Sequence, residues 1–199
     1  MFINRMKGIF SLLVVICFIS GCGSKIPCPV ASADNEIGPR LVAVLPVDNK
    51  TSDAQAARIL REKMLEELYF KGYPKIPLKI IDEKLNKIYK DKQGCMEGKT
   101  PPKAIGELLG VDAVMYCTLT EWKTSFVYFY ASTAVSASFE LRSAKTGETL
   151  WSAHCRVVKR NYGFSQEGLK IKSCQVYETA AQEVIEKAIS TLPDGPDSV

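Results

Sequence analysis

The residue pair best suited to nucleophilic chemistry is His154 beside Cys155, and His154 is the only histidine in the chain. A Cys–His catalytic pair needs both side chains within hydrogen-bond reach on one side of the backbone. The surrounding residues, 148–159, have the composition of a strand, and adjacent strand residues point to opposite faces of a sheet. We therefore expect a structural or surface histidine here rather than a catalytic pair.

Other polar residues offer little further chemistry. Asp48 and Asn49 follow an apolar segment and could touch a ligand at the carboxyl end of a strand, although such residues more often cap a turn or a helix. Glu121 beside Trp122 has no evident partner in the sequence. The motifs of metalloproteases, P-loops, dinucleotide-binding folds and nucleophile elbows do not occur in the sequence. We therefore expect no catalytic residues, no cofactor and no metal.

A different cysteine, Cys22, ends an apolar run near the amino terminus. Arg5 and Lys7 precede this run, and Gly8–Ile19 would be about 18 Å long as a helix, against a hydrocarbon core of roughly 30 Å. A basic segment, a short apolar segment and small residues are the parts of a secretory signal. Its end, ISGC at 19–22, resembles the bacterial lipobox, in which the thiol takes a diacylglyceryl group before cleavage ahead of it. The alternatives are an ordinary cysteine after a conventional signal, or an uncleaved anchor.

The lipobox divides the chain into four parts. They are a lipoprotein signal peptide (1–21), the lipidated cysteine with a flexible tether (22–39), a single periplasmic domain (40–193) and a tail (194–199). Bacterial lipoproteins typically carry three acyl chains, and each buried methylene contributes ~0.8 kcal/mol, so we expect permanent attachment. Gly23 follows Cys22, whereas retention in the inner membrane usually goes with aspartate. We therefore expect a lipid anchor in the outer membrane, with the domain facing the periplasm.

Charge and cysteine content narrow the classes of function further. Without the signal the formal net charge falls from +4 to +2, because Arg5 and Lys7 leave and no acid does. A nucleic-acid-binding protein usually shows a basic face or run, so we expect no nucleic-acid partner. The cysteines that remain beside the lipidated one are Cys28, Cys95, Cys117, Cys155 and Cys174. Their connectivity is open, although Cys117 and Cys155 fall in predicted strands and a disulfide could join them.

The first half of the domain is predicted to form a strand–helix–strand unit. Residues 40–49 are a short apolar run, typical of a strand buried on both faces. Ser52 and Gln55 resemble a capping box that opens a helix over 53–71. The predicted inward residues of this helix are Ala57, Leu60, Met64 and Leu68, and the outward ones Arg58, Arg61, Glu62 and Glu66. Residues 78–82 (LKIID) are predicted to be a second strand, parallel to the first.

The second half is predicted to be mostly strand. A polar helix near 83–92 and a short helix between Pro101 and Gly110 come first. The predicted strands cover 111–122, 133–142 and 148–159, a tight turn occupies 144–147, and a helix over 172–191 closes the domain. The order β-α-β-α-α-β-β-β-α predicts a mixed sheet with helices against it, in the α+β class.

Three of these segments together resemble a known family. VAVLPVDNKTSD (42–53), LGVDAVMYCTLTEW (109–122) and SAKTGETLW (143–151), in this order behind a lipobox, are similar to a meningococcal-type family of bacterial lipoproteins of unknown function. That family is similar in fold to the amino-terminal domain of TolB, and more distantly to the curli-secretion lipoprotein and the penicillin-binding-protein activator lipoproteins. The resemblance covers about residues 40–158 and the final helix. It implies a component of an envelope secretion or assembly system that works with other lipoproteins, and it implies no catalytic residues.

One aromatic stretch, WKTSFVYFYAS at 122–132, is the candidate contact surface inside the domain. Its aromatic residues, which crowd a predicted hairpin, are Trp122, Phe126, Tyr128, Phe129 and Tyr130. One interpretation is that one face of the hairpin is core and the last helix covers the other. The second is a partner-binding or membrane-proximal patch, because aromatic residues are enriched at interfaces. We take Trp122, Phe126, Tyr128 and Tyr130 as the predicted partner surface.

The sequence thus predicts a non-enzymatic outer-membrane lipoprotein that acts as an adaptor or assembly component of an envelope secretion or transport system. The expected partners are the membrane, through the lipid, and other envelope lipoproteins or secretion components, with a homo-oligomer as a further option. The main alternative is a ligand-binding module for peptidoglycan or another glycan. A pore-forming secretion subunit ranks lower, because the first half of the segment 125–141 does not alternate cleanly between apolar and polar residues.

Overall fold

The computed structural model describes residues 38–91, 101–163 and 165–198. The predicted signal peptide, the lipidated Cys22, most of the tether, and Cys28 and Cys95 lie outside these residues. Within the described part the elements are β1 (Val42–Val44), β2 (Asp48–Asn49), α2 (Ala54–Phe70), α3 (Leu78–Asp91), α4 (Pro102–Leu109), β3 (Ala113–Val127), β4 (Tyr130–Ser143), β5 (Thr149–Tyr162) and α5 (Gln166–Ile189).

The sheet is mixed, which confirms the predicted fold class. Its strand order is β1-β3-β4-β5, and β2 pairs with β3 further along, on the same side as β1. β1 and β2 run parallel to β3, whereas β3, β4 and β5 form an antiparallel meander. The predicted turn at 144–147 and the end of the short helix are confirmed as well, since Gly147 and Gly110 take the positive φ values that these positions need.

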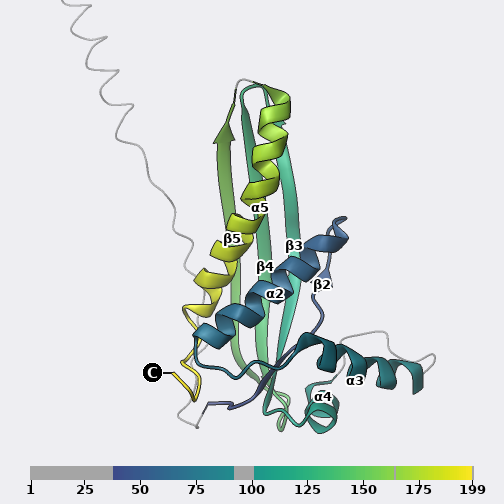
Figure 1. Cartoon of the computed structure of the whole chain (residues 1–199). Helices are drawn as coiled ribbons and strands as arrows, with labels where there is room; N and C mark the ends of the chain where they lie inside the picture. The colour runs from purple at the N-terminus through teal and green to yellow at the C-terminus, as the bar shows by residue number, and fades with distance from the viewer. Residues whose placement is uncertain (1–37, 92–100, 164, 199) are drawn as a thin grey trace, which may run out of the picture.

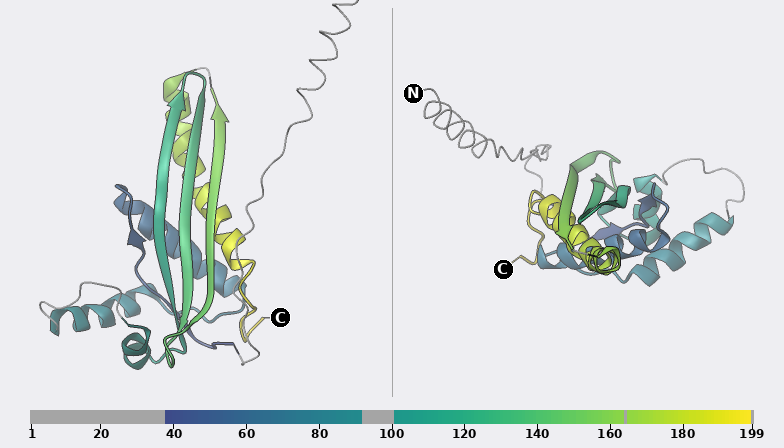
Figure 2. Two further views of the ribbon diagram at one scale, coloured as in Figure 1. Left: turned by 180° about the vertical axis from the view of Figure 1, so that it is seen from behind. Right: turned by 90° about the horizontal axis from the view of Figure 1, so that it is seen from above.

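Helices cover the two faces of the sheet unequally (Figures 1 and 2). α2 and α5 lie on one face, where Leu60 and Val184 pack in the same cluster as Phe139 of the sheet. α3 and α4 cover the base of the other face, with Ile81 and Ile105 in the cluster that contains Tyr116. The rest of this second face is open sheet, as the view from behind in Figure 2 shows.

The predicted strand at 78–82 is wrong, because these residues form the first turns of α3. Leu78, Ile81 and Leu85 recur at helical spacing, and the last two are buried, whereas Ile80 between them is exposed. Pro77 stands just before the helix, where its missing N–H costs nothing, and its carbonyl accepts the backbone N–H of Ile80. The connection from β2 to β3 is therefore made by helices α2, α3 and α4, and the parallel partner of β1 is β3.

The start of α2 differs by one residue from the predicted capping box. Asp53, not Ser52, is the N-cap, and its Oδ1 accepts the backbone N–H groups of Gln55 and Ala56 at 2.9 and 3.3 Å. The inward face includes Leu60, Met64 and Leu68 as predicted, but Ala56 is buried in place of Ala57.

Arg61 of α2 is also buried, although the helical pattern placed it outward. Its Nε and Nη2 donate to the carbonyl of Val44 at 3.2 and 2.9 Å, and its Nη1 donates to Asp82 at 2.9 Å. The guanidinium thus ties α2 to β1 and to α3 at one point. Hydrogen bonds from a charged group to a buried carbonyl are stronger than neutral ones, so this contact fixes the helices at the base of the sheet.

Arg61→Met should lower the free energy of unfolding by about 2–4 kcal/mol, because it leaves the buried Val44 carbonyl without its donor. The measurement is urea unfolding followed by circular dichroism. Arg58→Met is the matched control, since Arg58 is exposed on the same helix and pairs with Glu62 across one turn, so its loss should cost less than about 0.5 kcal/mol. Equal losses for the two variants would show that the buried arginine has no special role.

The upper part of the sheet projects beyond its parallel strands. β2 pairs with β3 at Thr118 and Leu119, and in the part of the chain that the structure describes no strand follows it along that edge. Beyond this point β3, β4 and β5 continue as three antiparallel strands, with the amino-terminal half of α5 along one face (Figure 1). We call this projection the arm: residues 120–136 of β3 and β4, residues 156–162 of β5, and the α5 segment beside them.

Candidate functional site

The arm ends in an exposed aromatic tip. β3 and β4 are joined by the two residues Tyr128 and Phe129, which are 88% and 67% exposed. Phe126, Val127 and Tyr162 beside them are exposed too, and the rings of Tyr130 and Tyr162 meet with centroids 6.1 Å apart. The backbone N–H of Gly163 donates to the carbonyl of Phe129 at 2.9 Å, so the β5–α5 connection closes over the same end. We call Phe126, Val127, Tyr128, Phe129 and Tyr162 the tip.

The turn at the tip holds a tyrosine in a backbone conformation that suits glycine or asparagine. Tyr128 has φ 41°, and it is the one non-glycine residue with positive φ among the described residues. A bulky residue in this region costs on the order of 1–2 kcal/mol, which Asn or Gly at a hairpin turn would avoid. The exposed ring of Tyr128 contributes no hydrophobic stabilisation that would offset this cost. The aromatic side chain at this position is therefore not explained by the stability of the fold.

The structure separates the four residues that were predicted to form one partner surface. Trp122 is in the core at 8% exposure, where its ring stacks on Tyr177 of α5 with centroids 4.8 Å apart and planes at 11°. Phe126 and Tyr128 lie at the surface, and Tyr130 is half-buried. Trp122 is thus a support of the arm rather than a contact residue. The surface role of the other three stays a prediction.

Hydrogen bonds support the arm beside this stack. Thr124 Oγ1 donates to the hydroxyl of Tyr177 at 2.8 Å, and it lies 2.8 Å from Thr133 Oγ1 on the neighbouring strand. These three groups satisfy one another in the half-buried layer between sheet and helix. The polar end of Tyr177 and its stacked ring together hold α5 against the arm.

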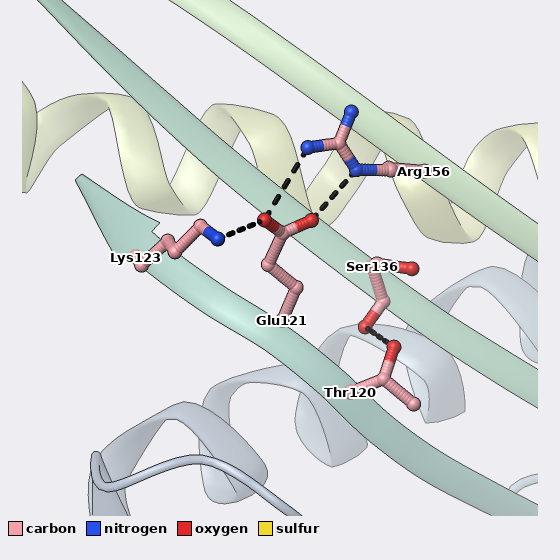
Figure 3. Close-up of polar contacts among 5 residues, drawn as sticks. All are labelled: Thr120, Glu121, Lys123, Ser136 and Arg156. Atoms are coloured by element: carbon pink, nitrogen blue, oxygen red, sulfur yellow. Dashed lines mark hydrogen bonds and ion pairs between the residues drawn. The ribbon is translucent and has the colours of Figure 1, made fainter. Parts of the chain in front are cut away.

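The open face of the arm carries a charged cluster that the sequence did not reveal (Figure 3). Glu121 of β3 receives two hydrogen bonds from Arg156 of β5, at 2.6 Å from Nε and 3.3 Å from Nη2, and Lys123 Nζ lies 2.9 Å away. A β-bulge at 119–121 produces this arrangement, since Thr120 and Glu121 both oppose Ser136, whose carbonyl accepts the Thr120 hydroxyl at 3.1 Å. Glu121 was expected to be an isolated acid, but its pair with Arg156 joins β3 to β5 across β4.

Arg156 and Lys123 stabilise the ionised form of Glu121. The hydrogen bond from Arg156 is the main cause that lowers the pKa of Glu121 from its ordinary 4.5 to about 2, and Lys123 acts in the same direction. The same contact raises the pKa of Arg156. A carboxylate held ionised by two cations is neither a general acid nor a general base near neutral pH, so this cluster is suited to bracing the arm and not to catalysis.

The Glu121 cluster should make the arm sensitive to acid. Above pH 4.5 the side chain is ionised in both the folded and the unfolded chain, and the full stabilisation is present. Between pH 4.5 and about 2 the unfolded chain takes up a proton that the folded one does not, so the contribution is lost as the pH falls. Because Arg156 is half exposed, we expect this contribution to be about 1 kcal/mol.

The test compares urea unfolding of the native protein and of Glu121→Gln at pH 6 and pH 3. The difference in unfolding free energy between the two proteins should shrink at the lower pH. A difference of the same size at both values would mean that the ion pair does not contribute to stability.

The other residues considered for chemistry have structural partners. His154 is exposed with Nδ1 2.9 Å from Ser138 Oγ, whereas Cys155 is buried on the opposite face, so the two do not form a catalytic pair, as expected. Asn49 caps a turn, since its Oδ1 accepts from the backbone and the hydroxyl of Thr51. Asp48 forms an ion pair with Lys50 at 2.9 Å.

The predicted Cys117–Cys155 disulfide is wrong. Both are buried thiols, but Cys117 lies in β3 opposite Phe139, and Cys155 lies in β5 opposite Ala137. β4 separates them, which places their Cα atoms about two strand spacings, or ~9–10 Å, apart. A disulfide needs Cα atoms within about 7 Å. Cys174, on α5, is exposed.

A surface hollow of about 480 Å³ lies at the base, between α4 and the β4–β5 turn. It is lined by Lys103, Gly106, Glu107, Gly110, Val111, Asp112, Ala144 and Lys145. No aromatic side chain is among these residues, whereas small-molecule sites are mostly lined by apolar and aromatic groups. Asp112 is moreover engaged, since its Oδ2 accepts the backbone N–H groups of Arg40 and Leu41. This hollow gives the glycan-binding alternative little support.

Comparison with known proteins places the chain in a family of bacterial lipoproteins. The family described as "Putative lipoprotein GNA1162-like" matches residues 32–194, so the chain belongs to this family and the predicted resemblance is confirmed. The chain is 26% identical over 153 residues to the lipoprotein NMB1124/NMB1162 of Neisseria meningitidis serogroup B, covering 76% of this chain and 71% of that one.

Two solved structures share the fold. Lipoprotein GNA1162 from Neisseria meningitidis matches with a TM-score of 0.54 at 23% identity, over 72% of this chain and 99% of that one. The PelC dodecamer from Paraburkholderia phytofirmans matches with a TM-score of 0.55 at 16% identity, over 84% of this chain and 97% of that one. At these identities the likeness establishes the fold. None of the described helices is both long and apolar enough to span a membrane.

Proposed function

We propose that this chain is an outer-membrane-anchored periplasmic lipoprotein that acts as a non-enzymatic adaptor or assembly component of an envelope secretion or transport system. The observation that carries the proposal is the exposed aromatic tip at the end of a braced arm. Exposed aromatic clusters of this kind mark contact surfaces. Membership in a lipoprotein family supports the anchor, and the likeness in fold to PelC, which forms a dodecamer, is in keeping with a role in an assembly.

In this proposal Cys22 carries the lipid, residues 1–21 are removed, and residues 22–39 tether the domain 40–193, with 194–199 as a tail. The tether joins the domain at β1, which pairs with the beginning of β3, whereas the tip lies at the other end of β3. Ala113 and Val127 are about 46 Å apart at ~3.3 Å per residue. The tether as a coil spans roughly 23 Å r.m.s.. The tip and the point where the tether joins therefore lie at opposite ends of the domain.

Cys22→Ala should abolish lipid attachment, because no other residue of the lipobox offers a thiol. The expected product is an uncleaved or soluble form, measured by membrane fractionation with mass spectrometry of the amino terminus. Cys28→Ala is the matched control and should remain processed and membrane-bound. Normal membrane attachment of Cys22→Ala would contradict the anchor.

Truncation of the tip should weaken complex formation more than folding. Phe126→Ala and Tyr128→Ala remove exposed rings, so we expect the yield of crosslinked partner in affinity purification from solubilised envelopes to fall several-fold while the melting temperature of Tyr128→Ala stays unchanged. Ile80→Ala, at an exposed apolar residue of α3, is the matched control. Unchanged co-purification with a lowered melting temperature would return these residues to a purely structural role.

A further inference from the structure

We infer that the tip docks on a second copy of this chain, in an acidic pocket at the opposite end of α5, so that copies associate head to tail. The inference rests on the proposed function in one respect, namely that the tip is the contact surface. It adds the identity of the partner that this surface binds. Two observations on the described residues carry it: the charges at the two ends of the molecule are opposite, and the end away from the tip presents a pocket with an exposed aromatic wall.

The end with the tip is basic. Residues 122–133 and 160–174, which form the end of the arm and the start of α5, contain Lys123, Arg160, Lys170 and Lys172 against one acid, Glu167. The formal net charge of these segments is therefore +3. Arg160, Lys170 and Lys172 are exposed, on the end of β5 and the first turns of α5. An exposed apolar tip on a basic end fits a concave apolar surface with an acidic rim.

The opposite end has such a surface. Where the carboxyl-terminal ends of α2 and α5 meet, a pocket of about 220 Å³ is lined by Glu67, Phe70, Lys71, Glu186, Ile189 and Ser190. Phe70 is 77% exposed and forms an aromatic wall, while Ile189 is buried at the floor. This volume is smaller than that of drug-sized ligand sites, which measure ~300–1,000 Å³, so it suits one or two inserted side chains.

The rim of this pocket is acidic. Residues 62–75 and 184–197 hold six acids (Glu62, Glu66, Glu67, Glu186, Asp194 and Asp197) against four lysines, a formal net charge of −2. Lys71 is neutralised locally, since its Nζ lies 2.7 Å from Asp194. Glu67 and Glu186 both accept hydrogen bonds from Gln182, at 2.6 and 3.0 Å, which holds the two carboxylates side by side at the pocket.

The geometry makes the contact intermolecular. The tip lies beside the amino-terminal end of α5 (Figure 1). The pocket is lined by Glu186, Ile189 and Ser190 at the carboxyl-terminal end of the same helix. α5 has 24 residues, so these ends are about 36 Å apart along the helix. A tip therefore reaches only the pocket of another copy. Since each copy then uses two different surfaces, the association is heterologous and continues from copy to copy until a ring closes or a filament forms.

The test separates the two surfaces with two variants. Tyr128→Asn combined with Phe129→Asn removes the tip, and Phe70→Asn removes the aromatic wall of the pocket. All three residues are more than half exposed, so the variants should fold, which circular dichroism and the melting temperature check. Ile80→Asn, on α3 and outside both the tip and the pocket lining, is the control. Full-length lipidated proteins in detergent are compared by native mass spectrometry and sedimentation velocity.

The native protein and Ile80→Asn should form species larger than dimers, and added salt should dissociate them. Each end variant alone should be monomeric, with self-association weakened at least tenfold. An equal mixture of the two end variants should give a dimer with one copy of each, because one intact tip meets one intact pocket and no further contact follows.

A monomeric native protein, oligomers that persist in either end variant, or a mixture that stays monomeric would each overturn the inference. If the native protein is monomeric while tip variants still lose their co-purifying partner, the proposed function stands and the tip binds another protein. Binding of the monomer to lipid vesicles through the tip would instead assign the tip to a membrane.

Discussion

The structure depends on the contact between α5 and a sheet that extends beyond its parallel strands. β2 ends where it pairs with Leu119 of β3, so the arm beyond that point consists of the strands β3, β4 and β5. Three strands need an apolar cover on at least one face to be stable in water. α5 supplies this cover through the stack of Tyr177 on Trp122 and the hydrogen bonds to Thr124. The Glu121–Arg156 pair ties β3 to β5 on the open face. With both faces braced in this way, the arm does not depend on the exposed ring of Tyr128 at its end.

Strands and helices whose apolar residues recur at a regular spacing could be predicted from the sequence. Contacts that depend on an interruption of that spacing could not. In β4, Val135, Ala137, Phe139 and Leu141 alternate with more polar residues, which is the pattern of a strand with one face in the core, and all four are buried. In β3, alternation counted from Leu119 would place Glu121 inside and Trp122 outside. The bulge reverses both, so the tryptophan predicted as a contact residue lies in the core and the glutamate expected to be isolated is paired. Residues 78–82 are too few to distinguish strand from helix, and the helical period appears only once Leu85 is included.

Long-range polar contacts were beyond sequence reasoning for a related reason. Arg61 lies at a position that the helical pattern makes polar, but the nearby carbonyl of Val44 and the carboxylate of Asp82 draw it inward. Arg156 meets Glu121 across 35 positions of chain, and only the register of three strands brings them together. The opposite charges of the two ends are readable in the sequence, yet their separation along α5 requires the fold.

The central claim is that the tip is the surface through which this lipoprotein meets other molecules in the envelope. The most direct test is photo-crosslinking in cells, with a photoreactive phenylalanine analogue in place of Tyr128 and, as a control, in place of the exposed Ile80 of α3. Position 128 should give discrete crosslinked species that mass spectrometry identifies, while position 80 gives only background. No crosslink from position 128, or equal crosslinking from both positions, would contradict the claim.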